Sequence, residues 1–376
     1  MDVSAAFESL HAEVRELLPA AAVVVDAHTH LGRDEDGQAL DPAGLLASLD
    51  EIGPTARACT FPLHDPDREP AYRVPNDRVL RWAQESGGRL YPYCRLDPAE
   101  EPVLEAERCL ALGARGIKLH PRAQAFGFAD DAAESIWKVA QEANVPILVH
   151  AGRGMPRMDP LADLALRYPD VVVVLAHAAI ADQGMFASRL RDHPNVVYDT
   201  STFSVFDHLE LLARVPVERI VFASDPPYGL PATSLYMALR VAAHAGLDEA
   251  AVRGMLGGTI AGLIDGRGLP PVTPPRRGSS VTLSGRLARV YGYGSLAGPA
   301  IFMGSAEQAQ AMLEMALAAC RDPDPGSVGE ALATIETALG AAGAQLALET
   351  EDGTRAAIDL VYRAIVRAAT ELPDGG

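Results

Sequence analysis

The sequence has 376 residues, of which 50 are acidic and 32 basic, so its net charge is −18 at pH 7, and 48% of its residues are hydrophobic. A chain this acidic lacks the positive surface that binds nucleic acid and is repelled by anionic membranes, while its hydrophobic content excludes disorder over most of its length. Its longest apolar stretches are too short to span a bilayer, its four cysteines form no CxxC pair, and its first residues lack the basic start of a signal peptide, so we expect a cytoplasmic protein.

Eight short apolar runs rich in β-branched residues follow one another along the chain. They are Val23–Ala27, Ala58–Pro62, Leu90–Arg95, Arg115–Leu119, Pro146–Val149, Val171–Ala176, Val196–Asp199 and Ile220–Ala223. Most are continuously apolar, which is typical of parallel strands buried on both faces. Amphipathic segments such as Ala132–Ala143 and Ser234–Ala245 lie between or after them. The alternation predicts an α/β fold, a (β/α)8 TIM-like barrel. An open doubly wound sheet is the alternative, which the absence of a GxGxxG motif after the first strand disfavours.

The composition changes after the barrel. The segment LPPVTPPRRGSS at Leu269–Ser280 is rich in proline and predicts a linker. We therefore divide the chain into a barrel domain at residues 1–268, a linker at 269–281 and a helical C-terminal extension at 282–376. The extension contains three predicted helices, at Ala306–Cys320, Ser327–Leu339 and Thr354–Glu371. Their apolar stripes need a surface to pack against, and we expect them to support a homodimer.

Polar side chains at the end of the first strand are candidate functional residues, because catalytic groups of such barrels lie at the carboxyl ends of the strands. The sequence there is DAHTH at residues 26–30. Residues i and i+2 of a strand face the same side, so His28 and His30 point together, and two imidazoles at this spacing bind one divalent metal. By itself the pair is a weak signal, since two polar turn residues would look the same. Asp26 faces the same way, either as a hydrogen-bond partner below the ligands or as a simply buried residue.

The other strand ends carry the same kinds of side chain. They present Lys118 and His120, then His150, His177 and Asp225. Five of the ten histidines of the chain lie at these predicted ends. The gaps between the ends correspond to whole numbers of strand–helix units of about 30 residues. Chance placement at successive strand ends is improbable, so the sequence predicts a metal site in the barrel mouth.

These motifs resemble the amidohydrolase superfamily and, within it, the amidohydrolase-related branch. The segments DAHTH, GIKLHP, VH, LAH and SDPP match its strands 1, 4, 5, 6 and 8, over residues 22–266. The resemblance implies one or two divalent ions, with His28 and His30 as ligands of the first ion. Asp225 would also bind this ion and accept a proton from metal-activated water. His150 and His177 would bind a second ion; in one-metal relatives the strand-5 histidine is the third imidazole ligand and the strand-6 histidine is an acid–base or electrophilic residue.

Lysine is rare in this chain, which has 30 arginines but only Lys118 and Lys138. In two-metal relatives a strand-4 lysine is carboxylated by CO2 and bridges the ions, and a guanidinium cannot do this chemistry. The resemblance therefore implies Lys118 as a further metal ligand, with a structural ion pair inside the barrel as the alternative. Imidazole and carboxylate ligands favour Zn²⁺, with Mn²⁺ or Fe²⁺ as alternatives.

The ligand set predicts a metal-dependent hydrolase that cleaves an amide, ester, lactone or thioester bond of a small-molecule substrate with metal-activated water. The expected catalytic residues are Asp225 and His177. A metal-dependent nonoxidative decarboxylase or hydratase on the same barrel is the alternative, and a noncatalytic barrel is disfavoured by the full ligand set. Four further side chains are expected to line the mouth and contact the substrate: Arg95, His120, Arg153 and Tyr228. An arginine there would bind a substrate carboxylate or pair with an acid of the chain.

Overall fold

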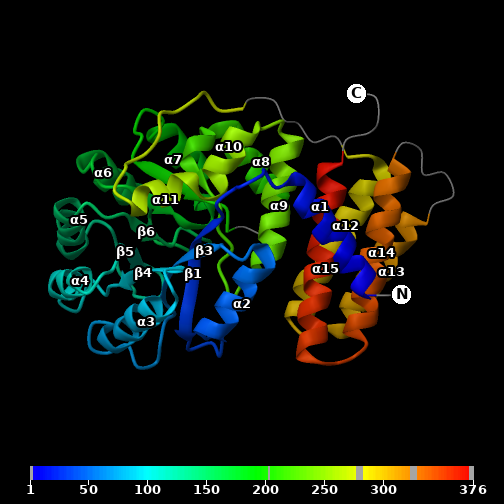
Figure 1. The fold of residues 1–376 in the computed structure, drawn as a ribbon, viewed down its shortest axis with the longest axis horizontal. Helices are drawn as coiled ribbons and strands as arrows, with labels where there is room; N and C mark the ends of the chain where they lie inside the picture. The colour runs from blue at the N-terminus through cyan, green and yellow to red at the C-terminus, as the bar shows by residue number, and fades with distance from the viewer. Residues whose placement is uncertain (1–2, 202–203, 277–282, 322–327, 372–376) are drawn as a thin grey trace. The chain divides into compact units, whose positions relative to one another are not determined.

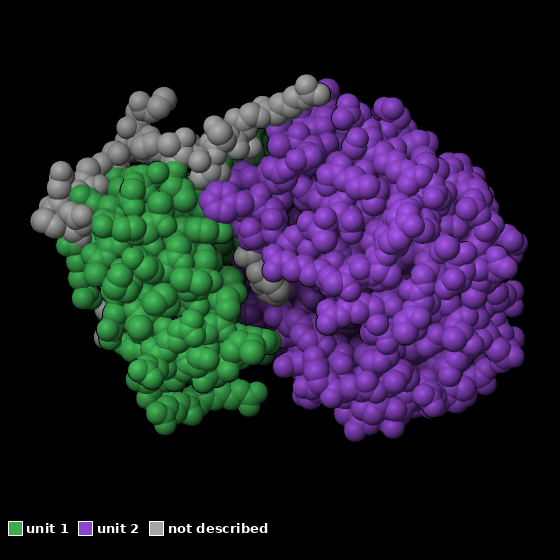
Figure 2. Space-filling view, turned by 180° about the vertical axis from the view of Figure 1, so that it is seen from behind, with its two compact units in different colours: residues 1–19, 235–247, 278–376 green, residues 20–234, 248–277 purple. Residues whose placement is uncertain are grey.

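The computed structural model describes residues 3–201, 204–276, 283–321 and 328–371. The chain forms two compact units, which Figure 2 colours separately. One unit consists of residues 20–234 and 248–277 and contains all the described strands. The other consists of residues 1–19, 235–247 and 278–376, and its described elements are helices.

A single curved sheet forms the centre of the first unit (Figure 1). Its strands are β1 (Val25–Arg33), β2 (Ala39–Leu40), β3 (Arg57–Pro62), β4 (Leu90–Arg95), β5 (Gly116–Leu119), β6 (Ile147–Val149), β7 (Val173–Leu175), β8 (Val196–Asp199) and β9 (Ile220–Val221). The strand order is β2-β1-β3-β4-β5-β6-β7-β8-β9, with every pair parallel except β1 and β2. Backbone hydrogen bonds of 2.9 Å from Ala27 N to Phe222 O and from Asp225 N to His28 O close the sheet. The predicted TIM-like barrel with C-terminal helices is confirmed.

The register of the strands decides which side chains point into the barrel. The interior core includes Val25, Phe61, Tyr93, Leu148, Val174 and Val197. Leu148 pairs with Lys118, which in turn pairs with Arg95 on the next strand. Residues paired across neighbouring parallel strands share a face, so Lys118 and Arg95 also point into the barrel. A buried lysine and a buried arginine therefore lie on the inner face of an apolar barrel, where an unpaired charge is costly.

Helices alternate with the strands, as the sequence predicts. They are α2 (Pro42–Ile52), α3 (Arg73–Glu85), α4 (Pro102–Ala111), α5 (Asp131–Ala143), α6 (Asp159–Arg167), α7 (Gln183–Arg189), α8 (Val205–Arg214), α10 (Glu249–Arg253) and α11 (Thr259–Ile264). Short 3-10 turns occupy Ala176–Ala179 and Val217–Arg219, and a π-helical turn occupies Gly254–Gly258. Ile260 and Leu263 of α11 join the barrel core beside Val25, so this helix packs at the amino end of β1.

The second unit contains α1 (Val3–Leu17), most of α9 (Pro231–His244), α12 (Gly285–Phe302), α13 (Ala306–Cys320), α14 (Gly329–Leu346) and α15 (Glu351–Thr370). The sequence predicted α13, α14 and α15 but missed α12, because its glycines and Pro299 disfavour helix. Those glycines let α15 approach closely: a Cβ built on Gly294 would lie 2.3 Å from Ile365 Cγ2. Tight packing between helices thus outweighs the low helix propensity of α12.

Glu13 explains why two segments that the sequence analysis assigned to the barrel belong to the helical unit. Its carboxylate accepts hydrogen bonds from Tyr236 Oη at 2.9 Å, Arg240 Nη1 at 2.7 Å and Arg367 Nη1 at 2.7 Å. The Arg240 guanidinium also donates to Glu371 at 3.0 Å. These bonds join α1, α9 and the end of α15 through charged groups that are largely withdrawn from water.

Some predicted features extend beyond the described residues, namely Ser327 of one predicted helix and residues 277–281 of the linker. The described part of the linker is attached to the barrel unit: Arg219 Nη1 donates to Pro270 O at 2.9 Å, and Thr273 Oγ1 donates to Glu218 at 2.8 Å. Of the described helices, none has both the length and the apolar character needed to cross a membrane.

Candidate metal centre

The side chains at the end of β1 converge as their spacing predicts. His28 Nε2 and His30 Nε2 lie 3.2 Å apart, and each lies 3.1 Å from Asp225 Oδ1. Both histidines are buried. His28, His177 and Asp225 also form a group whose ligand atoms all lie within 4.8 Å of one another, as a metal site requires. The structure thus brings together three predicted strand-end histidines and the predicted carboxylate.

The hydrogen bonds around His28 determine which of its nitrogens faces this group. Nδ1 lies 2.8 Å from Asp199 Oδ2, so the proton of a neutral ring belongs on Nδ1 and the Nε2 lone pair points toward His30 and Asp225. Asp225 Oδ1 has no hydrogen-bond donor of good geometry, and neither has His30 Nδ1. Lone pairs this close together repel unless a proton or a metal ion lies between them, so the donor set can hold a divalent metal.

The ionisation of these groups also suits a metal. Burial lowers the pKa of His30 to about 3 and lowers that of His177, so both rings are neutral. Burial raises the pKa of Asp225, but His28 and His30 lower it by more. The pKa of this carboxyl therefore lies well below its usual range. Burial and Lys118 lower the pKa of His28, whereas Asp225 and Asp199 raise it more, so a positive charge is favoured at this ring. The neutral imidazoles of His30 and His177 and the ionised carboxylate of Asp225 are ligands that Zn²⁺, Mn²⁺ and Fe²⁺ share, and a bound metal would displace a proton from His28.

His150 and Lys118 border the same group. His150 Nδ1 lies 3.0 Å from His177 Nε2, and Lys118 Nζ lies 3.3 Å from His28 Nε2 and 4.4 Å from the centre of the Phe61 ring. Lys118 is fully buried, and no carboxylate of the described residues forms an ion pair with it. Burial lowers the pKa of its amine to about 7. The geometry therefore speaks against the structural ion pair that was the alternative for this residue.

Sequence reasoning missed Asp199, although it ends a predicted strand and so satisfies the criterion that selected the others. It is fully buried and accepts hydrogen bonds from His177 N at 2.8 Å and Ser201 Oγ at 2.6 Å, besides its contact with His28. Ser201 Oγ in turn lies 3.0 Å from His177 Nδ1. Asp199 and Ser201 thereby orient two of the imidazoles that converge on the site.

Asp26 lies below the site, in contact with the backbone. It is fully buried, and its Oδ1 accepts from His28 N and Ser224 N, both at 3.1 Å, while its Oδ2 accepts from Ser224 Oγ. Burial raises the pKa of this carboxyl to about 7. Asp26 bonds no imidazole, so it fixes the two ends of the chain that carry His28 and Asp225 rather than the ligand atoms themselves.

The backbone is specialised at the same point. His177 and Asp225 have φ of 57° and 60°, in the left-handed region that non-glycine residues rarely adopt. A Cβ at Gly229 would lie 1.9 Å from Ser224 O, and one at Gly152 would lie 2.8 Å from His150 Nε2. Strained residues and obligatory glycines beside the predicted ligands are the pattern expected where a site has been shaped for function.

The predicted substrate-binding residues fall into two groups. Three lie at the mouth: His120 stacks on His150 with ring centres 3.8 Å apart, the Tyr228 ring lies 6.1 Å from that of His30, and Arg95 pairs in register with Lys118. Arg153 lies on the loop after β6 and is exposed.

Arg95 is buried without a carboxylate partner among the described residues. Its Nη1 donates to Pro62 O at 3.2 Å, its Nη2 lies 3.4 Å from His64 Nδ1, and the guanidinium covers the Tyr72 ring at 5.0 Å. Only neutral groups therefore surround this charge directly, which leaves it available to an anion.

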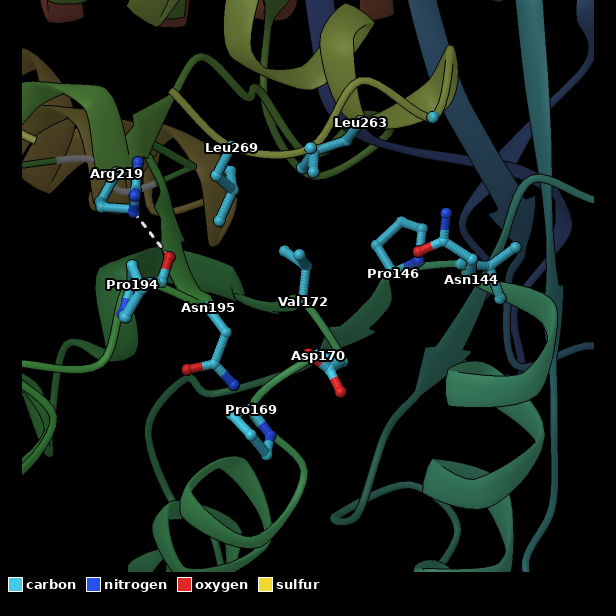
Figure 3. Close-up of a pocket in the computed structure, with 13 residues that line it drawn as sticks. Asn144, Pro146, Pro169, Asp170, Val172, Pro194, Asn195, Arg219, Leu263 and Leu269 are labelled. Atoms are coloured by element: carbon cyan, nitrogen blue, oxygen red, sulfur yellow. Dashed lines mark hydrogen bonds between the residues drawn. The ribbon is translucent and has the colours of Figure 1, made fainter. Parts of the chain in front are cut away.

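The cavity in Figure 3 lies at the opposite end of the barrel. It has a volume of about 290 Å³ and is lined by Pro146, Val172 and Asn195, which precede β6, β7 and β8. The strand-end side chains of the metal centre do not line it. This cavity is therefore separate from the predicted chemistry.

Comparisons with known proteins agree with the fold. Matching solved structures include an uncharacterised TIM-barrel protein from Bordetella bronchiseptica, at 12% identity and TM-score 0.51, covering 65% of this chain and 99% of that one. A 2,6-dihydroxybenzoate decarboxylase in complex with 2,6-dihydroxybenzoate matches at 15% identity and TM-score 0.50, with coverages of 65% and 99%. A 4-oxalomesaconate hydratase from Rhodopseudomonas palustris matches at 16% identity and TM-score 0.49, with coverages of 65% and 96%. At these identities, the first two matches support the fold and nothing finer. No curated protein matches the chain.

A match to a sequence model of a protein family identifies the family of this chain. The model described as amidohydrolase matches residues 25–264, which is more than half of the chain and includes every strand-end residue named above. With a closed parallel barrel and histidines and a carboxylate converging at its mouth, the chain belongs to the amidohydrolase family.

Proposed function

We propose that the protein is a metal-dependent hydrolase of a small molecule with an amide, ester, lactone or thioester bond. The observation that carries the proposal is the convergence of His28, His177 and Asp225, beside His30, on one point at the barrel mouth. The amidohydrolase family is metal-dependent. A divalent ion bound at this point supplies Lewis acidity, which activates a water and polarises a carbonyl.

The residues of the chain have distinct roles in this proposal. Asp225 uses Oδ1 to contact His28 and His30, so its other oxygen, Oδ2, is left to accept a proton from the attacking water and return it to the leaving group. His177, held through Nδ1 by Ser201, presents Nε2 to the same space as a ligand or acid–base group. Lys118, a buried amine without an ion pair, is proposed as the carboxylated ligand between two ions.

The buried guanidinium of Arg95 indicates the charge of the substrate. A buried guanidinium without a carboxylate partner is satisfied when a ligand brings the missing negative charge. His120 accepts a hydrogen bond from Ala123 N at Nδ1, so its Nε2 carries the proton and can donate to the same ligand. Tyr228 and Arg153 complete the proposed set of contacts at the mouth. We therefore propose a substrate with a carboxylate next to its scissile bond.

A one-metal decarboxylase or hydratase is the second candidate. It is favoured by the fact that the described residues gather into a single three-residue group with metal-site geometry. In that case His177 is the acid–base residue. Zinc as the ion, a homodimer and a cytoplasmic location stay predictions from the sequence, and so do the domain boundaries apart from the placement of residues 1–19 and 235–247.

Product analysis distinguishes the two candidates. The Zn²⁺-loaded protein is incubated with carboxylated esters, lactones, thioesters and amides and with aromatic acids, and the products are identified by mass spectrometry. We expect a product that has gained one water. Release of CO2 from an aromatic acid, with no hydrolysis of any acyl compound, would establish the second candidate instead. Arg95→Met should raise KM for the carboxylated substrate much more than for its methyl ester.

A further inference from the structure

A groove of about 750 Å³ runs along the outside of the barrel, away from the metal centre. The end of α7, the end of α8, the outer face of β8 and residues 272–275 line it. The described part of the predicted linker forms one wall, since Thr273 is bonded to Glu218 and Arg276 N donates to Leu212 O at 3.0 Å. The volume is in the range of small-molecule sites.

Tyr198 contributes a polar group to this groove. Val197 points into the barrel core, so its neighbour Tyr198 points outward, and it is among the residues that line the groove. The side chain is only 3% exposed, yet no described residue hydrogen-bonds its hydroxyl. Burial raises the pKa of this hydroxyl. The hydroxyl reaches the space of the groove, where it can bond to a ligand instead of to water.

Arg219 contributes a charge without a described carboxylate partner. It ends the 3-10 turn before β9 and so directly precedes Ile220, the residue that pairs in register with Tyr198. Arg219 is 5% exposed, and its Nε donates to Pro194 O at 2.6 Å, as Figure 3 shows. Its Nη1 donates to the carbonyls of Glu218 and Pro270. All these acceptors are neutral. Among the described residues, Nη2 has no acceptor and no carboxylate forms an ion pair with the guanidinium.

The remaining lining residues combine positive charge with apolar surface. Arg191 and Arg214 also line the groove, and Asp192 is the one acid among its lining residues; Arg214 is ion-paired with Glu210, so Arg191 and Arg219 supply the charge. The walls between these polar groups are apolar, with Leu190, Val196, Val215 and Val272 among them. A ligand that complements this groove has an anionic head and an apolar body.

We propose that this groove is a second binding site, which takes a small amphipathic carboxylate. The carboxylate binds Arg219 Nη2 and the Tyr198 hydroxyl, and the apolar body lies between α7 and α8 against residues 272–275. This site is independent of the hydrolase proposal, because none of its lining residues belongs to the metal centre.

The test uses decanoate as the probe and the full-length protein, with binding measured by isothermal titration calorimetry. Decanoate should bind at least about tenfold more tightly than decanol, which has the same chain but no charge. Tyr198→Phe, which removes only the hydroxyl, and Arg191→Glu at the exposed rim should each weaken decanoate binding about tenfold. Arg81→Glu makes the same change of charge on an exposed arginine of α3 outside the groove, and it should leave the affinity unchanged.

Two results would overturn the proposal. One is decanoate binding that is the same in Tyr198→Phe and Arg191→Glu as in Arg81→Glu, because a carboxylate bound at the barrel mouth would not respond to changes in the groove. The other is decanol binding as tightly as decanoate, which would mean that the groove recognises apolar surface alone, such as that of a peptide. Thermal unfolding of each variant confirms that loss of binding does not reflect loss of the fold.

Discussion

Asp199 Oδ2 lies 2.8 Å from Nδ1 of His28, and this contact determines that the other nitrogen of the ring faces the metal centre. The two residues are 171 positions apart in the chain and meet only because β8 and β1 belong to one closed barrel. A carboxylate behind a ligand imidazole holds the ring in one orientation and makes it a better donor.

Asp199→Asn should therefore weaken metal binding although Asp199 need not touch the ion. The amide keeps the shape of the side chain but no longer favours a proton on His28 Nδ1. We expect the affinity for Zn²⁺ to fall by roughly 10- to 100-fold, measured by competition with a chelator. Asp192→Asn makes the same change on an exposed residue and should have no effect. Equal affinities in the two variants would show that Asp199 has no role in orienting the ligand.

The double variant His28→Ala with His30→Ala tests the centre itself. We expect the purified protein to hold one to two divalent ions per chain and the double variant to lose most of them, because two imidazoles leave a single coordination set. Metal content by mass spectrometry measures this. His193→Ala alters a histidine outside the group and should keep the full content. If the double variant kept its full metal content, the metal would have to bind at another site.

Gly152 should be essential for the position of His150. A methyl group there would lie 2.8 Å from His150 Nε2 and 3.3 Å from His177 Cδ2, too close for either ring to stay in place. The Gly152 backbone is outside the left-handed region, so Gly152→Ala acts through this contact. We expect roughly tenfold weaker metal binding. Gly127→Ala, whose new methyl group would have its nearest neighbour at 3.8 Å, should bind metal normally; if both variants do, His150 is not a ligand.

Glu105 provides a prediction on stability and pH. The side chain is 2% exposed, and burial raises the pKa of its carboxyl. Hydrogen bonds from Arg108 at 2.7 Å and Asn76 at 2.9 Å lower this pKa by more, so the net effect is a pKa below 4.5. A lowered carboxyl pKa stabilises the fold above pH 4.5, and the stabilisation is lost as the pH falls through the lowered value. Glu105→Gln should reduce the free energy of unfolding by about 2–3 kcal/mol at pH 7. In urea titrations this difference should shrink toward pH 3; a constant difference would mean that the charge of Glu105 is irrelevant.

The sequence predicted the barrel, and it predicted which side chains meet at its mouth, because both depend on local pattern. Continuous apolar runs give strands, and a polar residue at the end of a strand must lie at the mouth whatever the details of packing. Hence the positions of His28, His150, His177 and Asp225 could be read before the structure. The role of Asp199 could not, because it depends on a contact across the closed barrel.

Two features of the helical unit, the helix α12 and the position of α1, were missed for different reasons. The glycines of α12 lower its helix propensity, and only the close approach of Ile365 to Gly294 shows why they are there. The position of α1 depends on Glu13, whose partners Arg240 and Arg367 are more than 200 residues away in sequence. Neither relationship leaves a periodic signal that a scan of the chain can detect.

Lys118 decides between the two-metal and one-metal chemistry. Its buried amine has a pKa of about 7 and forms no ion pair with a described residue. A neutral fraction is therefore present at physiological pH and can add CO2, with release of a proton, to form a carbamate. Lys118→Arg keeps a positive charge where the carbamate would place a negative one. We expect it to lose one metal ion and at least about 10²-fold in kcat, measured by metal analysis and steady-state kinetics.

Lys118→Ala provides the complementary test, since it leaves space where a carboxylate from solution can replace the carbamate. We expect a short acid such as propionate to restore part of both the metal content and the activity of this variant. Lys138→Arg, which alters the exposed second lysine, should change neither quantity. A crystal structure of the metal-loaded protein with an unmodified ammonium at Lys118 and one ion held by His28, His30, His150 and Asp225 would contradict the prediction. The proton transfers would then fall to His177, whose Nε2 is the neutral acceptor that the barrel already directs toward His28 and Asp225.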